Sequence, residues 1–196
     1  SFESRDPHMV VGAIGNGWEF NPANGSDHVK GVMIDFSTDF SINVWAKPDL
    51  YNYGEIIGRN NGVSITTYAD GHIYFMGGTT ATGLLQDNEW SMITVTMEAS
   101  SQDTQIYHNG VKTSCDGGAT TNDCTYPHGA ISAGLVEYYI GSMNGMSYGN
   151  NTMPFDGVID ELAIWNRVLT SQDIESFVDV EKTDVNALDA LGRGAS

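Results

Sequence analysis

The chain has 196 residues, which suits one domain with enough length to bury a core without help from metals or disulfides. Its 25 acidic and 8 basic residues give a net charge of −17, which excludes nucleic acid and anionic membrane surfaces as partners because phosphate binding needs clustered Lys and Arg. The longest apolar runs are only as long as a strand, which excludes direct membrane insertion.

The surplus of acid fits cation binding, a salty environment or simple solubility. The acids are scattered rather than gathered in one run, so solubility in seawater-like conditions is favoured. The first residue is Ser rather than Met, which indicates an excised or processed piece of a larger protein. The missing signal peptide therefore says nothing about export.

Residues 1–9 show no hydrophobic period and are interpreted as an entry arm. Residues 18–20 predict a short strand, and a turn-rich stretch follows. Residues 40–48 predict the clearest strand of the chain. One face of this strand carries Phe40, Ile42, Val44 and Ala46, and the other carries Ser41, Asn43, Trp45 and Lys47.

Short strands are predicted along the rest of the chain, at residues 54–59, 63–68, 72–76, 88–96, 104–108 and 135–142. Asp70-Gly71 predicts a hairpin turn, because both residues accept a positive φ, and Asn109-Gly110 predicts a type I′ hairpin turn. The 23 glycines and the short alternating apolar runs favour an all-β domain.

Cys115 and Cys124 are the two cysteines of the chain, and they lie nine residues apart in a polar, Gly-rich loop. No histidine or second cysteine pair stands at zinc spacing, so a local disulfide that staples the loop is favoured, with two free thiols as the alternative. A closed disulfide would indicate an oxidising compartment.

The stretch 154–177 organises the C-terminal part of the chain. It predicts a turn, then a strand over residues 158–169, and then a short helix in which Thr170 is the N-cap and Asp173 the reciprocal acid. Asp160 interrupts the strand, and a buried strand tolerates a carboxylate only where it is hydrogen-bonded or holds a metal. Residues 181–196 are polar and acidic and are interpreted as a C-terminal tail or linker.

The closing stretch, F-D-G-V-I-D-E-L-A-I-W-N-R-V-L, resembles the last strand of laminin-G-like, concanavalin A-like jelly rolls, and F-S-I-N-V-W-A-K-P resembles an inner strand of the same family. Further matches lie at 10–31, 88–96, 104–110 and 135–142. The resemblance implies an all-β, two-sheet antiparallel β-sandwich with one short helix after the last strand, as a single domain over residues 10–180. A fainter resemblance to pentraxins lacks their carboxylates at residues 142–144.

The resemblance also implies a structural calcium that joins the closing strand to the N-terminal region. Asp160 would be a ligand, backbone oxygens of residues 19–31 would complete the shell, and Asp27 would be a second carboxylate. The alternatives are that Asp160 accepts hydrogen bonds from loop amides with no ion present, and that Asp27 belongs to a turn.

Jelly-roll binding modules place aromatic platforms and polar side chains on their loops. Four loops of this chain carry such residues, although Tyr and Asn are also ordinary loop residues. The candidate ligand-binding residues are Tyr51, Asn52, Tyr53, Arg59, Asn60, Asn61, Tyr68, Asn144, Tyr148 and Asn150. Trp45, Trp90 and Trp165 are interpreted as packing residues, whereas Trp18 fits either a buried or an exposed position.

Catalytic motifs are missing from the sequence. The carboxylate spacing of related glycoside hydrolases does not occur, and neither does G-x-S-x-G or H-E-x-x-H. We therefore expect a non-catalytic module, extracellular or on the cell surface, that serves carbohydrate binding or adhesion and belongs to a multidomain parent protein. Its partner would be a glycan or cell-surface ligand. The alternatives are a spacer or protein–protein interaction domain and, ranked lower, a polysaccharide hydrolase or lyase, because fold alone does not decide function.

Overall fold

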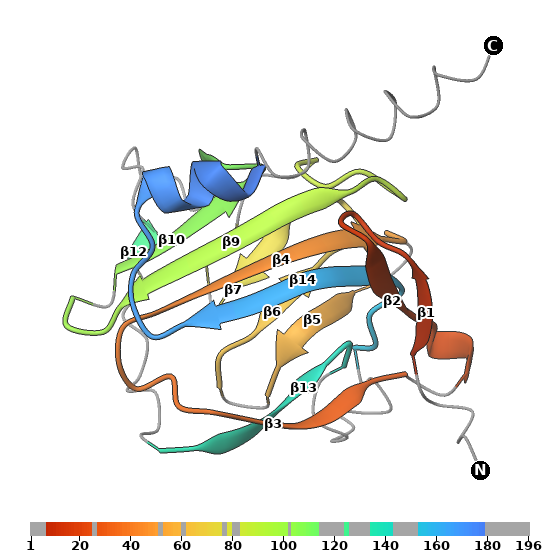
Figure 1. The fold of residues 1–196 in the computed structure, drawn as a ribbon, viewed down its shortest axis with the longest axis horizontal. Coiled ribbons are helices and arrows are strands. Elements are labelled where there is room, and N and C mark those ends of the chain that lie inside the picture. Colours follow the sequence, from red (N-terminus) through yellow and green to blue (C-terminus); the bar gives the residue numbers. More distant parts are fainter. Residues whose placement is uncertain are drawn as a thin grey trace.

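The computed structural model describes residues 7–24, 27–50, 53–59, 62–75, 78–79, 83–101, 103–113, 124–125, 134–142 and 153–178. Within these ranges, two antiparallel sheets form the two layers of a sandwich, and an α-helix over residues 171–178 follows the last strand (Figure 1). The predicted all-β, two-sheet architecture with a short helix after the closing strand is therefore confirmed. None of the helical residues in these ranges forms a segment long and apolar enough to cross a membrane.

The larger sheet combines strands from both ends of the chain, so the closing strand lies inside the sheet and not at its edge. In spatial order its strands are β1 (His8–Val11), β2 (Asn16–Phe20), β14 (Gly157–Trp165), β4 (Phe40–Pro48), β9 (Ser91–Glu98), β10 (Asp103–His108) and β11 (Val111–Lys112), with β12 (Cys124–Thr125) also paired to β10. A 3-10 turn, η1 (Pro22–Asn24), follows β2.

The smaller sheet is built from the middle of the chain. Its strands in spatial order are β3 (Val29–Ile34), β13 (Val136–Ile140), β5 (Gly54–Gly58), β6 (Ile65–Thr67), β7 (Ile73–Phe75) and β8 (Gly78–Thr79). The hairpin between β10 and β11 turns at Asn109 and Gly110, whose φ angles of 49° and 81° fit the predicted type I′ turn.

The alternation of β4 divides its side chains between two apolar clusters. Its predicted inner face, which carries Phe40, Ile42, Val44 and Ala46, lies in the main core between the sheets. Trp45 lies on the opposite face, where a second cluster includes Met92, Leu169 and Ile174. The helix therefore covers the outer face of the larger sheet, as Figure 1 shows over β9 and β10.

The tryptophans on or beside the strands pack in this second cluster rather than between the sheets. Trp45 is buried, while Trp90 and Trp165 are partly buried against it, and Trp165 stacks on Phe177 with ring centroids 5.3 Å apart. Trp18 is 47% exposed. The alternation of a strand predicts that a tryptophan is buried. It does not predict whether the opposite sheet or the C-terminal helix covers it.

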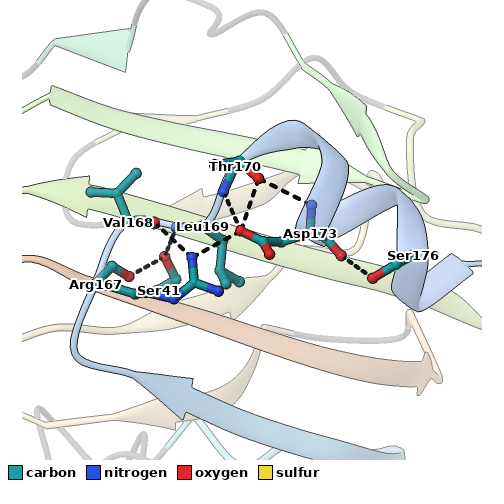
Figure 2. Close-up of polar contacts among 7 residues, drawn as sticks. All are labelled: Ser41, Arg167, Val168, Leu169, Thr170, Asp173 and Ser176. Carbon is teal, nitrogen blue, oxygen red and sulfur yellow. Dashed lines mark hydrogen bonds and ion pairs between the residues drawn. The ribbon is translucent and has the colours of Figure 1, made fainter.

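The connection from β14 to the helix is fixed by side-chain hydrogen bonds. Ser41 Oγ donates to the carbonyl of Arg167 and accepts the Leu169 amide, both at 2.9 Å (Figure 2). Because these groups bond to a side chain and not to a neighbouring strand, β14 ends at Trp165 and not at residue 169 as predicted. The predicted capping box is confirmed, since Thr170 Oγ1 accepts the Asp173 amide and Asp173 Oδ2 accepts the Thr170 amide.

Candidate functional site

Four rings gather at one end of the smaller sheet. Gly54 pairs with Thr67 in the β5–β6 ladder, so the residues just outside this pair, Tyr53 and Tyr68, are neighbours. Their ring centroids lie 4.6 Å apart in an edge-to-face arrangement. Tyr68 also stacks on His72 at 4.0 Å and lies 6.3 Å from Tyr74. We call Tyr53, Tyr68, His72 and Tyr74 the aromatic cluster.

Tyr53 is the member of the aromatic cluster that is open to a ligand. It is 48% exposed, whereas one face of Tyr68 is occupied by His72. Burial raises the pKa of the Tyr68 hydroxyl, and the neighbouring Tyr74 and Tyr53, followed by the charges of Asp70 and Glu55, act in the same direction. The cluster therefore combines one exposed aromatic platform with nearby negative charge.

A pocket of about 390 Å³ adjoins the aromatic cluster through Asp70, whose carboxylate pairs with His72 Nδ1. We call it the acidic pocket. Its lining includes Asp49, Leu50, Asp70, Leu85, Gln86 and Asp87.

Three loop segments line the acidic pocket, and hydrogen bonds join them. Asp87 Oδ1 accepts the Leu50 amide at 2.9 Å, which joins the segment after β4 to the segment before β9. The Leu85 amide donates to the carbonyl of Gly71 at 2.9 Å, which joins the β6–β7 turn to the same segment. The pocket is therefore held by hydrogen bonds between loops, and its volume lies within the range of small-molecule sites, about 300–1,000 Å³.

The acidic pocket carries the chemistry needed to hold a polar ring. Its carboxylates and the Gln86 amide can accept hydrogen bonds from hydroxyl or amino groups. Leu50 and Leu85 supply apolar contact. A ligand in the pocket could extend past Asp70 toward the exposed ring of Tyr53.

Arg59 does not join this site. It follows β5, whereas Tyr53 precedes it, so the strand Gly54–Gly58 separates the two residues. Burial raises the pKa of the Tyr138 hydroxyl, and the Val63 amide and the positive charge of Arg59 oppose that shift. Arg59 thus lies near Tyr138 at the opposite end of the strand.

The other predicted ligand residues fall outside the described ranges: Tyr51, Asn52, Asn60, Asn61, Asn144, Tyr148 and Asn150. Cys115 is also outside them, and Cys124 is described only through its strand β12, so the disulfide stays a prediction.

Asp160 is held by backbone amides. Its Oδ2 accepts the Ile14 amide at 2.9 Å and its Oδ1 accepts the Glu161 amide at 2.8 Å. A β-bulge lies between Asp160 and Ala163, and Glu161 adopts a φ of 47° there. The carboxylate therefore joins the closing strand to the loop after β1 through hydrogen bonds to protein groups.

Asp27 is also buried, but at a different place. Its Oδ2 accepts the Asn21 amide at 3.0 Å, and its Oδ1 has no hydrogen-bond partner among the described residues. Gly157 pairs with Phe20, so Asn21 lies near the start of β14, about 10 Å along the strand from Asp160. The structure thus does not bring Asp27 and Asp160 into one shell, and no group of three or more potential metal ligands occurs among the described residues.

Glu55 is a functional candidate that sequence reasoning missed. It pairs with Thr66, which lies on the outer face of the smaller sheet because its neighbour Ile65 is in the main core. Glu55 is fully buried, and in the part of the chain that the structure describes neither of its carboxylate oxygens has a hydrogen-bond partner. Burial raises its pKa to about 8. The sequence signal was an acid inside the apolar run G-E-I-I-G.

His72, Tyr74, Asp49 and Asp87 were also missed as site residues. The Asp70-Gly71 turn was the signal available for the first two, because a tight hairpin must place Tyr68 beside His72. The Tyr68 amide indeed donates to the His72 carbonyl at 3.1 Å. No local pattern pointed to Asp49 and Asp87, which meet only through the packing of loops.

These features define a concanavalin A-type β-sandwich with a pocket among its loops. A family model described as the concanavalin A-like lectin/glucanases superfamily matches residues 23–175, and the chain belongs to this family. A search of curated proteins finds no significant match.

Solved structures share the fold at low sequence identity. The binding domain of Paraclostridial Mosquitocidal Protein 1 aligns with a TM-score of 0.62 and 17% identity, over 89% of this chain and 45% of that one. Domain 4 of the extracellular arabinanase AbnA from Geobacillus stearothermophilus, solved with arabinotriose, aligns with a TM-score of 0.59 and 18% identity, over 88% and 81%.

A pentraxin from Limulus polyphemus aligns with a TM-score of 0.58 and 15% identity, over 91% and 84% of the two chains. At such identities the similarity shows the fold alone. The chain spans less than half of the mosquitocidal structure.

Proposed function

We propose that the chain is a non-catalytic module that binds a glycan at the acidic pocket and the aromatic cluster. The observation that carries the proposal is the contact of the exposed Tyr53 with Tyr68, beside a pocket that Asp70 links to the same rings. An aromatic platform takes the apolar face of a sugar, and carboxylates take its hydroxyls. The proposal places the module in an extracellular or cell-surface multidomain protein, where it serves recognition or adhesion.

The family and the solved structures support this proposal without identifying the ligand. The family is that of lectins and glucanases. AbnA domain 4 was solved in complex with arabinotriose, which shows that a domain of this fold from another protein can hold a sugar.

The test is a glycan array, followed by titration calorimetry with each ligand found. We expect Tyr53→Ala to weaken binding at least about tenfold, because it removes the exposed platform, and to leave the melting temperature nearly unchanged. Trp18→Ala is the matched control, since Trp18 is equally exposed but lies on β2 of the other sheet.

An array without hits, repeated with calcium, would favour the alternative of a spacer or protein–protein domain. Equal losses in both variants would show that binding does not use the aromatic cluster.

A polysaccharide hydrolase is the second candidate, and the three carboxylates of the acidic pocket favour it. A glycosidase needs one carboxyl group that keeps its proton in a desolvated site. Asp49, Asp70 and Asp87 are all exposed. Glu55 keeps its proton, but it is fully buried and does not line the pocket, so a substrate there would not reach it. Both observations favour binding over catalysis. Release of reducing ends from polysaccharides, lost in Asp49→Asn or Asp87→Asn, would overturn the non-catalytic proposal.

We further propose a structural calcium at Asp27 rather than at Asp160. Within the described ranges, the buried Oδ1 of Asp27 has no hydrogen-bond partner, whereas both oxygens of Asp160 accept amides. Ca²⁺ takes carboxylate and backbone oxygens, and a ligand that binds only the folded state must stabilise it. The test is thermal melting with CaCl₂ and with EDTA. A calcium-dependent rise in melting temperature that disappears in Asp27→Asn supports the site. A melting temperature that is the same with CaCl₂ and with EDTA contradicts the proposed calcium.

A further inference from the structure

The acidic pocket carries negative charge without a basic side chain to balance it. Asp49, Asp70 and Asp87 contribute three carboxylates, and none of the described residues that line the pocket is Lys or Arg. An uncharged sugar can use such acceptors, but an anionic sugar would meet like charge on three sides.

The hydrogen bonds of these carboxylates do not neutralise them. Asp87 accepts the Leu50 amide and the side-chain amide of Asn88, and both donors are neutral. Asp70 pairs with the imidazole of His72, whereas Asp49 and Asp87 form no ion pair among the described residues.

The negative charge extends beyond the lining of the pocket. Burial raises the pKa of Asp156, and the charges of Asp49 and Glu19 raise it further. The neighbourhood of Asp49 therefore already contains mutually repelling carboxylates, which a cationic group would relieve.

The aromatic cluster favours the same kind of ligand. The faces of tyrosine rings attract cations through their quadrupole. Asp70, which pairs with His72, places one carboxylate beside these rings. Glu55 adds no charge there, because burial raises its pKa to about 8 and it keeps its proton at neutral pH. Both halves of the site thus stabilise positive charge.

We propose that this site selects glycans with free amino groups, that is, de-N-acetylated hexosamines, and rejects glycans with uronate or sulfate groups. This inference rests on the proposed function. The ammonium group is placed in the acidic pocket among Asp49, Asp70 and Asp87, and the sugar ring extends toward Tyr53.

The test uses three trisaccharides on the complete chain: the glucosamine trimer, the N-acetylglucosamine trimer and trigalacturonate. Calorimetry is carried out at about pH 6, below the ordinary pKa of an amino group, and at about 50 and 300 mM NaCl. We expect the glucosamine trimer to bind at least about tenfold more tightly than the N-acetylated trimer, with the preference reduced at high salt, and trigalacturonate not to bind.

The combined variant Asp49→Asn, Asp70→Asn, Asp87→Asn keeps the shape of the pocket and removes its charge, so the preference should disappear. The control variant Glu98→Gln, Glu161→Gln, Glu175→Gln removes as much charge from exposed positions elsewhere, and it should keep the preference. This control is needed because a chain of net charge −17 attracts any cation.

Binding of trigalacturonate, or an equal loss of preference in the pocket and control variants, would overturn the inference. If neutral glycans bind and the amino group gives no advantage, the inference fails and the proposed function stands. If neither these trimers nor the glycan array gives binding, the proposed function itself fails.

Discussion

Glu55 is buried and has no hydrogen-bond partner among the described residues, so it makes the stability of the protein depend on pH. The pKa of Glu55 is about 8 in the folded protein because burial disfavours the carboxylate, whereas an unfolded Glu has an ordinary value of 4.5. At a pH below the pKa of the unfolded state, Glu55 carries its proton in both states. Its ionisation therefore does not change the free energy of unfolding there. As the pH rises toward 8, the unfolded chain releases the proton while the folded chain retains it, so stability falls; above 8 the loss is constant.

Glu55→Gln should therefore stabilise the protein most at alkaline pH. The upper limit of the gain at about pH 9, relative to about pH 4, is roughly 5 kcal/mol, because the pKa rises from 4.5 to about 8 and one pKa unit corresponds to about 1.4 kcal/mol. Urea unfolding of both proteins across this range measures the difference. A gap between the two stability curves that does not change with pH would show that Glu55 finds a partner for its charge.

Ser41 shows how one hydroxyl can fix a connection. Its Oγ donates to the Arg167 carbonyl and accepts the amide of the buried Leu169 (Figure 2). Ser41→Ala leaves that amide without a partner, and we expect a loss of about 2 kcal/mol in urea unfolding. Ser176→Ala is the control, because Ser176 is exposed and its hydroxyl donates to the carbonyl of Asp173 in the same helix. Equal effects of the two substitutions would contradict this role of Ser41.

At the scale of elements, the capping box holds the start of the helix that covers the second apolar cluster. The hydrogen bond from Arg167 and those from the amide and hydroxyl of Thr170 keep the pKa of Asp173 well below its usual range. Asp173 therefore remains a charged acceptor at the helix N-terminus at all but strongly acidic pH.

Thr170→Ala should destabilise the protein by about 1 kcal/mol, because the Asp173 amide loses its acceptor. Thr170→Ser keeps the hydroxyl and should restore most of the stability. Thermal unfolding monitored by tryptophan fluorescence is a suitable measurement, since Trp45, Trp90 and Trp165 lie in the cluster under the helix. If the serine variant is as unstable as the alanine variant, the hydroxyl is not the source of the effect.

The elements that the sequence predicted best are those fixed by local chemistry. The alternation of β4, the Asn109-Gly110 turn and the capping box each depend on residues within about nine positions, and all three occur in the structure. The end of β14 was predicted four residues too late, because the bond of Leu169 to Ser41 spans 128 positions. Such a contact leaves no periodic signal.

The candidate site was only partly predictable for the same reason. Tyr53 and Tyr68 were proposed from residue type, and the β5–β6 register brings them together. Arg59 was proposed on the same grounds, yet the length of β5 separates it from them. Asp49 and Asp87 join the site through loops that meet only after the two sheets have packed, and Glu55 needed the register with Thr66 to show which face it occupies.

At the scale of the whole molecule, the two sheets have different exposed faces. The helix covers the outer face of the larger sheet, whereas the aromatic cluster lies at one end of the smaller sheet and the acidic pocket lies among loops that connect strands of both sheets. The proposed site and the helix therefore involve different residues, and a ligand at the pocket does not need to displace the helix.

The net charge of −17 acts on the whole molecule as well, because the folded state holds the acids closer together than the unfolded state does. Added salt screens this repulsion, with a Debye length that falls from about 30 Å at 0.01 M to about 8 Å at 0.15 M. Exposed ion pairs such as Arg167–Asp173 would be weakened by the same salt, but each contributes little.

We therefore expect the melting temperature to rise by several degrees between about 0.01 and 0.5 M NaCl, with most of the rise below about 0.15 M, where the Debye length changes most. Differential scanning calorimetry measures this, and KCl should give the same curve, since screening depends on ionic strength and not on the identity of the ion. A variant with Glu98, Glu161 and Glu175 changed to Gln should show a smaller rise, because it begins with less repulsion. A fall in melting temperature with salt would mean that attractive ion pairs outweigh the net charge.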